Sequence, residues 1–337
     1  MYLVEKVRTG FLGVAHFHAD SYAQSLKTIP QAELVGVFDR DKGLAHEFSQ
    51  KFSVPTYDDM EKLLKICDAV VITSENALHH EYAVKAAEEG KHILCEKPMT
   101  TTLRDADELV GLVEKKRIVF QMCYVMRYHT VTSLARDLVV GGRIGRLLVM
   151  VGTNKLNRSL PLLRAWFTDK SLSGGGAVMD HTVHLSDLMR WISSAEVVEV
   201  YTEIGRNANP KLQVEDSFLT TVVMGDGSIG HIDGSWTYSS GHYTWGDVTL
   251  ELLGSEGVLQ VDAFRQNVYF ISSEKPDDRL VWHYYGCNPD LLLVKDFIQC
   301  ILGGGKPRAN VYDGRQGVAV TLASYQSSME GRPVRPG

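Results

Sequence analysis

The first 124 residues alternate between short apolar runs and segments with helical periodicity. The apolar runs predict strands at residues 4–12, 34–38, 54–57, 68–73, 92–94 and 119–122. Between them, apolar residues recur three and four positions apart, which predicts helices at residues 19–26, 42–52, 58–66, 82–87 and 103–113. Strands that alternate with helices predict an α/β fold with a doubly wound parallel sheet.

The pattern changes beyond residue 125. One helix is predicted at residues 130–140, and then strands dominate, at residues 147–154, 197–202, 218–224, 228–236, 248–253, 258–261, 268–271 and 280–284. Segments 224–228 and 254–257 carry the glycines of tight hairpins, which join antiparallel strands. Two late helices are expected at residues 290–302 and 313–330. We therefore predict two domains, residues 1–124 and residues 125–337, the second an α+β domain on a large, mainly antiparallel sheet.

Composition agrees with a two-domain globular protein. The chain has 337 residues, of which 44% are hydrophobic and 23% charged. Its net charge of -6, with Lys and Arg scattered along the chain, gives no electrostatic footprint for nucleic acid or for an anionic membrane surface. The N-terminal residues lack the apolar core of a signal peptide, and no apolar run approaches the ~20 residues that span a bilayer.

The cysteines suggest a reducing compartment. Their number is odd, they are widely spaced and none forms a CxxC pair; they are Cys67, Cys95, Cys123, Cys287 and Cys300. This usage predicts free thiols and a cytoplasmic location. No zinc motif is visible, so no metal is expected.

The turn after the first predicted strand partly matches a dinucleotide fingerprint. In G-x-G-x-x-G terms, Gly13 fills the first position, Ala15 replaces the second glycine and His18 replaces the third. A methyl group at Ala15 still permits fairly close approach of a pyrophosphate. His16 and His18 either contact the cofactor or satisfy backbone groups at the start of the helix, and the sequence leaves both interpretations open.

The end of the second predicted strand strengthens the case for a dinucleotide. Asp39 stands where such folds place the acid that bonds the adenine ribose hydroxyls, which predicts NAD as the cofactor. Arg40 keeps NADP as an alternative, because a guanidinium beside the acid can hold a 2'-phosphate.

The segment Cys95-Glu96-Lys97-Pro98 follows an apolar run that ends where a parallel sheet delivers its carboxyl ends. Proline has no backbone donor and keeps Lys97 out of the helical region. A lysine at the mouth of a buried sheet suggests an ammonium that faces a cleft, although a surface lysine in a strand-to-helix turn is the simpler interpretation of the tetrapeptide alone.

A second constellation lies in the later half of the chain. Three glycines at positions 174–176 precede a helical pattern in which Asp180 and His184 are four residues apart, with Asp187 three further on. A carboxylate beside an imidazole orients the ring and raises its basicity, as a general base requires. Taken alone, Asp-x-x-x-His is more often a core histidine satisfied by a neighbouring acid.

Together these motifs resemble the Gfo/Idh/MocA oxidoreductases, the family named for glucose-fructose oxidoreductase and inositol dehydrogenase. The matching elements occur in order over nearly the whole chain, and they are Gly13, Asp39, the turn at residues 73–80, Cys95-Glu96-Lys97-Pro98, and Gly174-Gly175-Gly176 running into Asp180 and His184. The departure from the family pattern, at Ala15 and His18, concerns pyrophosphate binding and not the fold.

The resemblance implies a Rossmann domain for the dinucleotide at residues 1–124 and a domain for substrate binding and oligomerisation at residues 125–337. It implies that Lys97, Asp180 and His184 form the catalytic group. Together with the position of Pro98, it also predicts a cis Lys97-Pro98 bond. A homodimer or homotetramer through the outer face of the second sheet is expected.

The candidate binding residues follow from these motifs. Cofactor contacts are expected from Gly13, Ala15, His16, His18, Asp39, Arg40, Thr73, Ser74, Asn76, His79, Glu96 and Lys97. Substrate contacts are expected from Lys97, Arg127, Tyr128, Arg164, Trp166, Asp180 and His184, with Asn154 and Lys155 as further polar candidates.

These residue types suit a dehydrogenase that acts on a secondary alcohol or ketone of a sugar, cyclitol or related small polyol. His184 would take the hydroxyl proton, Asp180 would orient His184 or bond a neighbouring hydroxyl, and Lys97 would favour the developing alkoxide. Two other functions remain open at this stage. One is a glycoside hydrolase that retains NAD, and the other is a non-catalytic dinucleotide sensor, against which the intact catalytic group counts.

Overall fold

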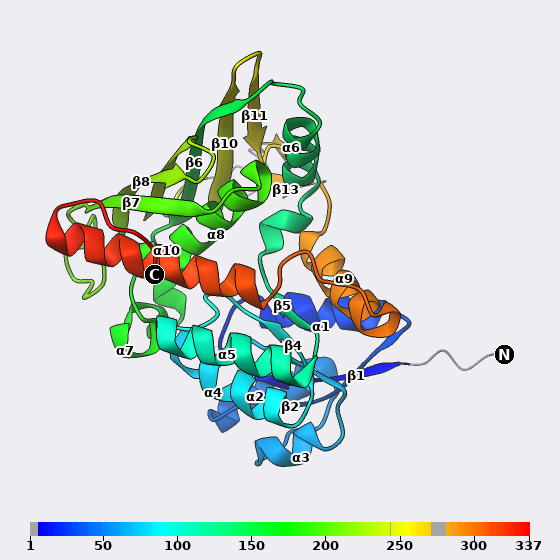
Figure 1. Ribbon diagram of the computed structural model, residues 1–337. Helices are drawn as coiled ribbons and strands as arrows, with labels where there is room; N and C mark the ends of the chain where they lie inside the picture. Colours follow the sequence, from blue (N-terminus) through cyan, green and yellow to red (C-terminus); the bar gives the residue numbers. More distant parts are fainter. Residues whose placement is uncertain (1–5, 243, 271–280, 285) are drawn as a thin grey trace. The chain divides into compact units, whose positions relative to one another are not determined.

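The computed structural model describes residues 6–242, 244–270, 281–284 and 286–337, which form two compact units (Figure 1). The first unit contains Met1–Tyr128, Ser171–Gly174 and Pro289–Val318. The second contains His129–Lys170, Gly175–Asn288 and Ala319–Gly337. Both units are therefore discontinuous in sequence, and the domain boundary near residue 124 stays a prediction.

The first unit is built on a five-stranded parallel sheet of order β2-β1-β3-β4-β5. The strands are β1 (Val7–Leu12), β2 (Ala32–Phe38), β3 (Ala69–Ile72), β4 (His92–Cys95) and β5 (Phe120–Met122). Every residue of β3 is buried, as expected for a strand covered on both faces. After β1 the chain continues to β2 on one side of β1, and after β2 it returns to β3 on the other side of β1. This reversal puts a topological switch point at the carboxyl ends of β1 and β3.

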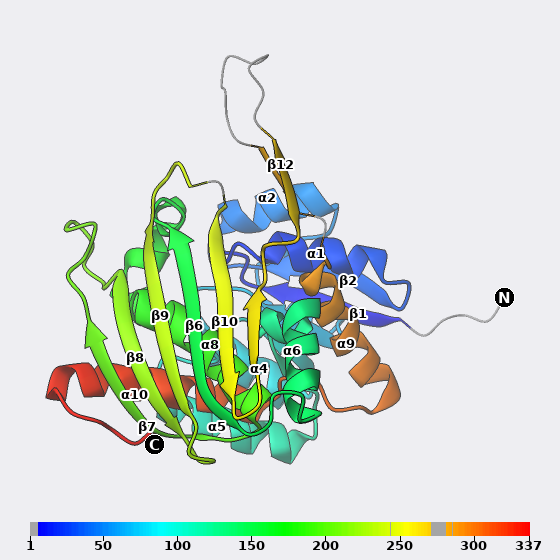
Figure 2. The same ribbon diagram turned by 90° about the horizontal axis from the view of Figure 1, so that it is seen from above.

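Helices cover both faces of this sheet (Figures 1 and 2). They are α1 (Ala19–Thr28), α2 (Lys42–Phe52), α3 (Met60–Leu64), α4 (His79–Glu88), α5 (Leu103–Lys116) and α9 (Pro289–Gly303), with the 3-10 turns η1 (Asn76–Leu78) and η2 (Val125–Tyr128). Helix α1 packs on α9, and α4 packs on α5. The predicted doubly wound sheet is confirmed, and α9 joins it from the far end of the chain.

One predicted strand of the first unit is wrong. Residues 54–57 form only an isolated bridge between Thr56 and Val37. Pro55 offers a carbonyl but no N–H group, so the contact ends after Val37 has donated to Pro55 O and accepted from Tyr57 N. The predicted helix at residues 58–66 is shorter in the structure, since α3 begins only after its capping residue Asp59.

The second unit is built on a six-stranded sheet of order β11-β10-β6-β9-β8-β7 (Figure 2). Its strands are β6 (Leu147–Asn157), β7 (Val197–Ile204), β8 (Ser217–Met224), β9 (Ile229–Tyr238), β10 (Gly246–Gly254) and β11 (Val258–Asp262). All neighbours are antiparallel except β6 and β9, which are parallel. The mainly antiparallel sheet and both predicted hairpins are thus confirmed.

One face of this sheet is covered by α8 (Ala177–Ser193), which packs on β6, β8 and β9 and is buried along most of its length. The remaining elements are α6 (Thr130–Val140), η3 (Pro161–Leu163), η4 (Ala165–Thr168), α7 (Lys170–Ser173), the two-stranded pair β12 (Asn267–Phe270) and β13 (Val281–Tyr284), and α10 (Val311–Glu330). Parts of three predicted strands lie outside the described residues. They are Val4 and Glu5 of the strand at 4–12, Ile271 of the strand at 268–271 and Leu280 of the strand at 280–284.

All five cysteines are free thiols. Among the described helices, none combines the length and apolar character needed to cross a bilayer.

Candidate active site

The turn after β1 lies close against the turn after β3. Gly13 has a φ of 76°, and a Cβ added there would lie 2.3 Å from the Cβ of Ser74. Its backbone is held on both sides, because its N–H donates to Phe38 O at 2.7 Å and its carbonyl accepts from Thr73 Oγ1 at 2.6 Å. His16 N also donates to Thr73 O at 2.9 Å. Only glycine fits this position, which leaves the backbone open for a ligand at the switch point.

Asp39 is fixed at the carboxyl end of β2. One carboxylate oxygen accepts from Val14 N at 2.7 Å and the other from Asp41 N at 2.8 Å. Burial raises the pKa of Asp39, and the two backbone donors oppose that rise. Each carboxylate oxygen has capacity for a further donor, so the residue suits the ribose hydroxyls predicted for it.

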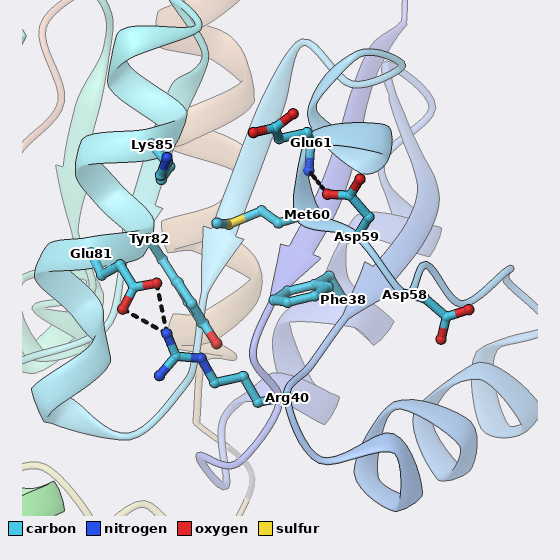
Figure 3. A pocket seen from close by; sticks show the side chains of 9 residues that line it. All are labelled: Phe38, Arg40, Asp58, Asp59, Met60, Glu61, Glu81, Tyr82 and Lys85. Atoms are coloured by element: carbon cyan, nitrogen blue, oxygen red, sulfur yellow. Dashed lines mark hydrogen bonds and ion pairs between the residues drawn. The ribbon is translucent and has the colours of Figure 1, made fainter.

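Arg40 turns away from Asp39 toward helix α4. Its Nη2 lies 2.6 Å from both carboxylate oxygens of Glu81, and its guanidinium lies over the ring of Tyr82, 5.6 Å from the centroid. Figure 3 shows these side chains at the edge of a pocket of about 290 Å³. Because Glu81 already engages the guanidinium, Arg40 is less available for a 2'-phosphate than the sequence alone suggested.

Glu96 directly follows β4 and has no exposed surface. One of its oxygens accepts from Tyr22 OH at 2.6 Å and lies 3.0 Å from His18 Nδ1, and the other accepts from Lys97 N at 2.9 Å. His16 Nδ1 is 3.8 Å from the same carboxylate. Burial alone would raise the pKa of Glu96, but His16, His18 and Lys97 together outweigh it and hold that pKa well below its ordinary range. The structure therefore brings His16, His18 and Glu96 together around a buried negative charge.

Two partners of this cluster were missed by sequence analysis. Tyr22 stands four residues after His18 on α1, a spacing that could have indicated the contact. Asp290 lies in the first turn of α9, and its carboxylate acts on the pKa of His18. No local pattern could have found it, since the two residues are far apart in the chain.

Asn76 and His79 make contacts within the first unit. Asn76 Nδ2 donates to Ser173 O at 2.8 Å. The ring nitrogens of His79 lie 2.7 Å from Pro98 O and 3.2 Å from Ser74 O, and burial lowers the pKa of this histidine. These two side chains hold the turns around the switch point, whatever further contacts a cofactor would make.

Lys97 is the second residue after β4 and is only 6% exposed. Its bond to Pro98 is cis, which confirms the prediction. It belongs to the first unit, whereas Asp180 and His184 belong to the second.

Asp180 and His184 both lie on α8 and are buried. Asp180 Oδ2 accepts from Trp236 Nε1 of β9 at 2.9 Å, and His181 Nε2 lies 3.7 Å away. The predicted helix is confirmed, but the role of Asp180 in orienting His184 stays a prediction. Asp187 lies 3.9 Å from Arg190 on the same helix.

The start of α8 is held by Glu215, another residue that sequence analysis missed. Its Oε1 accepts from Gly176 N at 2.8 Å, from Val178 N at 3.1 Å and from Tyr325 OH at 2.6 Å. A Cβ at Gly176 would lie 2.0 Å from Glu215 O, which explains the last glycine of the triplet. A carboxylate at a helix N-terminus satisfies unpaired backbone donors and the helix dipole.

The expected substrate residues fall into two groups. Arg127 bonds Arg308 O and lies 2.9 Å from Asp313, and Tyr128 OH donates to Asp296 at 2.6 Å. These contacts tie η2 to later parts of the first unit. In the second unit, Trp166 is 7% exposed and stacks on Phe167 with ring centroids 4.1 Å apart, and Arg164 immediately precedes η4. Lys155 lies 2.7 Å from Asp233, and Asn154 is buried beside it on β6.

Known proteins match both parts of the chain. Residues 7–124 match the model of an oxidoreductase family with an NAD-binding Rossmann fold, and residues 132–260 match the GFO/IDH/MocA C-terminal domain. The chain is 27% identical to scyllo-inositol 2-dehydrogenase (NAD(+)) of Bacillus subtilis over 98% of this chain and 96% of that protein. It is 26% identical to myo-inositol 2-dehydrogenase of Thermotoga maritima over 98% of each. The crystal structure of GenD2 from gentamicin A biosynthesis, in complex with NAD, has a TM-score of 0.89 at 21% identity, with 100% of this chain and 98% of that chain covered, and shows the same fold.

The close approach at Gly13 can be tested by substitution. Gly13→Ala should weaken NADH binding by at least roughly tenfold, because the added methyl group combines a left-handed φ with a collision against Ser74. Gly227→Ala is the matched control, since Gly227 has a φ of 86° and nothing within 4 Å of the added Cβ. Fluorescence titration with NADH, alongside a thermal melt, gives the comparison. Equal binding by the two folded variants would contradict the assignment of this turn.

Proposed function

Since this chain belongs to the Gfo/Idh/MocA family of NAD-binding oxidoreductases, we propose that it transfers a hydride between NAD and a secondary alcohol or ketone of a sugar, cyclitol or related small polyol. The observation that carries the proposal is the position of Lys97. This buried lysine stands at the carboxyl edge of the same parallel sheet as Gly13 and Asp39, whose geometry fits a dinucleotide. A buried ammonium is costly unless it serves a partner or a reaction.

Bound NAD supplies the carbon that accepts the hydride. In the proposed reaction, His184 takes the proton from the reacting hydroxyl while a hydride leaves the substrate carbon that bears this hydroxyl, so that a ketone forms. The ammonium of Lys97 favours the negative charge that develops on the oxygen. Asp180, which Trp236 holds by a hydrogen bond, orients His184 or bonds a neighbouring hydroxyl.

The inositol dehydrogenases among the relatives make cyclitols the first substrates to examine. The test is a screen of cyclitols, sugars and their keto forms with NAD or NADH, read at the nicotinamide absorbance. Turnover with a polyol supports the proposal. Release of a leaving group from a glycoside without a net absorbance change would instead indicate a hydrolase that retains NAD.

We also propose that the outer face of the six-stranded sheet joins copies of this chain into a homodimer or homotetramer. Burial alternates along the strands, and α8 covers the buried face. The other face exposes apolar side chains, among them Val151 on β6, Tyr201 on β7 and Leu219 on β8. Light scattering on Leu219→Glu should show a smaller species than the unaltered chain, and a monomeric unaltered chain would contradict the proposal.

The cofactor preference should favour NAD over NADP. Asp39 repels a 2'-phosphate, and Glu81 neutralises the nearby cation of Arg40. Asp39→Asn should narrow the preference by removing the repulsion, and Glu81→Gln should narrow it by releasing Arg40. Dissociation constants for NADH and NADPH measure both effects. A tenfold preference of the unaltered protein for NADP would show that this assignment of Asp39 and Arg40 is wrong.

The proposed catalytic group predicts non-additive kinetics. Lys97→Ala and His184→Ala should each lower the rate of hydride transfer by a factor on the order of 10²–10⁴ while NAD binding stays nearly unchanged. The double variant should be little worse than the poorer single variant, because each group is useful only while the other acts on the same hydroxyl.

A purely structural His184 gives a different result. In that case His184→Ala would cost about 1–3 kcal/mol of stability, and activity would fall only with the folded fraction. Turnover per folded molecule therefore decides the matter, with folding checked by thermal melt and NADH binding by fluorescence. Near-normal turnover in both single variants would remove the pair from the mechanism.

A further inference from the structure

His18 occupies the position of the third fingerprint glycine, at the N-cap of α1. Its side chain makes no capping hydrogen bond to the helix, and its ring is about one-third exposed (32%). A glycine here would let helix and strand approach closely and present backbone N–H groups to a pyrophosphate. In this chain an ionisable ring stands at that fingerprint position.

The groups around His18 come from four parts of the first unit. His16 of the preceding turn lies edge-on, with ring centroids 5.1 Å apart. Tyr22 of α1 has its hydroxyl 3.0 Å from His18 Nδ1, and Glu96 at the end of β4 lies at the same distance. Lys97 follows Glu96 and lowers the pKa of His18, whereas Asp290, in the first turn of α9, raises it. Among the described residues, the carboxylates of Glu96 and Asp290 and the ammonium of Lys97 therefore act on the charge of the ring.

The hydrogen bonds assign the Nδ1 proton. Tyr22 OH donates to Glu96 at 2.6 Å, so the hydroxyl hydrogen is already used. His18 Nδ1 therefore donates to the Glu96 carboxylate, as an N–H group beside a buried anion should. The ring is held through this nitrogen, and in the protonated ring Nε2 carries a second N–H group.

The balance of charge favours the protonated ring. Burial by itself lowers the pKa of His18, but the carboxylates of Asp290 and Glu96 outweigh both burial and the ammonium of Lys97, and raise it to about 9. Asp290 feels the reciprocal effect, since burial raises its pKa and His18 opposes that rise. A protonated histidine with the ordinary pKa would instead lose its proton near pH 6.5.

We propose that His18 serves as a proton-dependent cation for the phosphates of the dinucleotide, and that Asp290 is a positioning residue that maintains this charge from α9. The inference rests on the proposed NAD-dependent function. It accounts for the departure from the glycine fingerprint, because a charge-assisted hydrogen bond from His18 replaces contacts that a closer backbone would make. The positive end of the α1 dipole attracts the phosphates as well, so the helix and the charge on His18 act in the same direction.

The sign of the pH dependence follows directly. The charge on His18 is present below pH 9 and is lost as the pH rises through about 9, so dinucleotide affinity should fall over that interval. Removing the carboxylate of Asp290 should move the loss of affinity to lower pH. Removing the histidine itself should abolish the transition and weaken binding at neutral pH.

The test is fluorescence titration of the full-length protein with NADH between pH 6.5 and 10. The unaltered protein should lose affinity by roughly tenfold across the upper part of this range, in line with the difference between charged and neutral hydrogen bonds. His18→Gln should be weaker by a similar factor at pH 7 and should show no transition. Asp290→Asn should shift the midpoint down by roughly half a pH unit or more.

Asp20→Asn is the matched control. It makes the same acid-to-amide change on α1, but the Asp20 side chain is exposed and pairs with the exposed Lys51, and it is not among the groups that shift the pKa of His18. Its midpoint should equal that of the unaltered protein. Histidine NMR of the protein without NADH reports the His18 titration separately, so that a shift in binding can be matched to a shift in the ring.

The outcomes separate the two proposals. Constant NADH affinity from pH 7 to 10 overturns the inference, as does a transition that persists in His18→Gln or a midpoint that Asp290→Asn and Asp20→Asn shift equally. Absence of NADH binding at every pH, in protein that is folded by thermal melt, overturns the proposed function itself.

Discussion

The nucleotide end of the first unit depends on a carboxylate that water does not reach. A buried charge is tolerated only where donors and opposite charges surround it. Glu96 obtains them from three directions: Tyr22 on α1, His18 in the turn before α1, and the backbone N–H of Lys97. The same anion therefore fixes the turn proposed to meet the phosphates and the backbone of the lysine proposed for catalysis. Loss of either partner would leave the other facing an incompletely satisfied charge.

The second unit uses a carboxylate in a comparable way. Glu215 accepts two backbone N–H groups at the start of α8 and a hydroxyl from Tyr325, and these bonds determine where the helix begins. Asp180 lies in the first turn that follows, where Trp236 of β9 holds it. Each unit thus positions its proposed catalytic residues with an acid that itself makes no proposed contact with substrate.

The elements that were predicted correctly are those whose structure is decided by local interactions. Helices α2 and α6 have the predicted bounds, since capping or periodicity marks both ends, and the hairpins follow from their glycines. The strand predicted at residues 54–57 is only a bridge, because the apolar residues suggested a strand but Pro55 lacks the backbone donor that would extend it. The parallel pairing of β6 with β9 could not be read from either strand, because register between distant strands depends on packing of the whole sheet.

The same distinction applies to the candidate site. Asp39 and Glu96 directly follow β2 and β4, and Lys97 is the next residue after Glu96. These three residues were identified because parallel strands deliver their carboxyl ends to one edge of the sheet. Arg127 and Tyr128 were assigned to substrate from their residue types, but their polar atoms contact Asp313 and Asp296 from the last part of the chain. Polar residues next to a predicted site are thus ambiguous until the segments that satisfy them are known.

The segments late in the chain complete the packing of the first unit, and they also supply a carboxylate that acts on His18. Gln121 Nε2 donates to Leu293 O of α9, and Met122 N donates to Ala309 O, so the edge strand β5 is satisfied by residues from beyond position 288. Helix α9 packs on α1 and carries Asp290 in its first turn. The packing that closes the core of this unit is therefore the same packing that sets the electrostatic field at His18. A change that displaced α9 would disturb the charge of the phosphate turn even if every residue of that turn were unchanged.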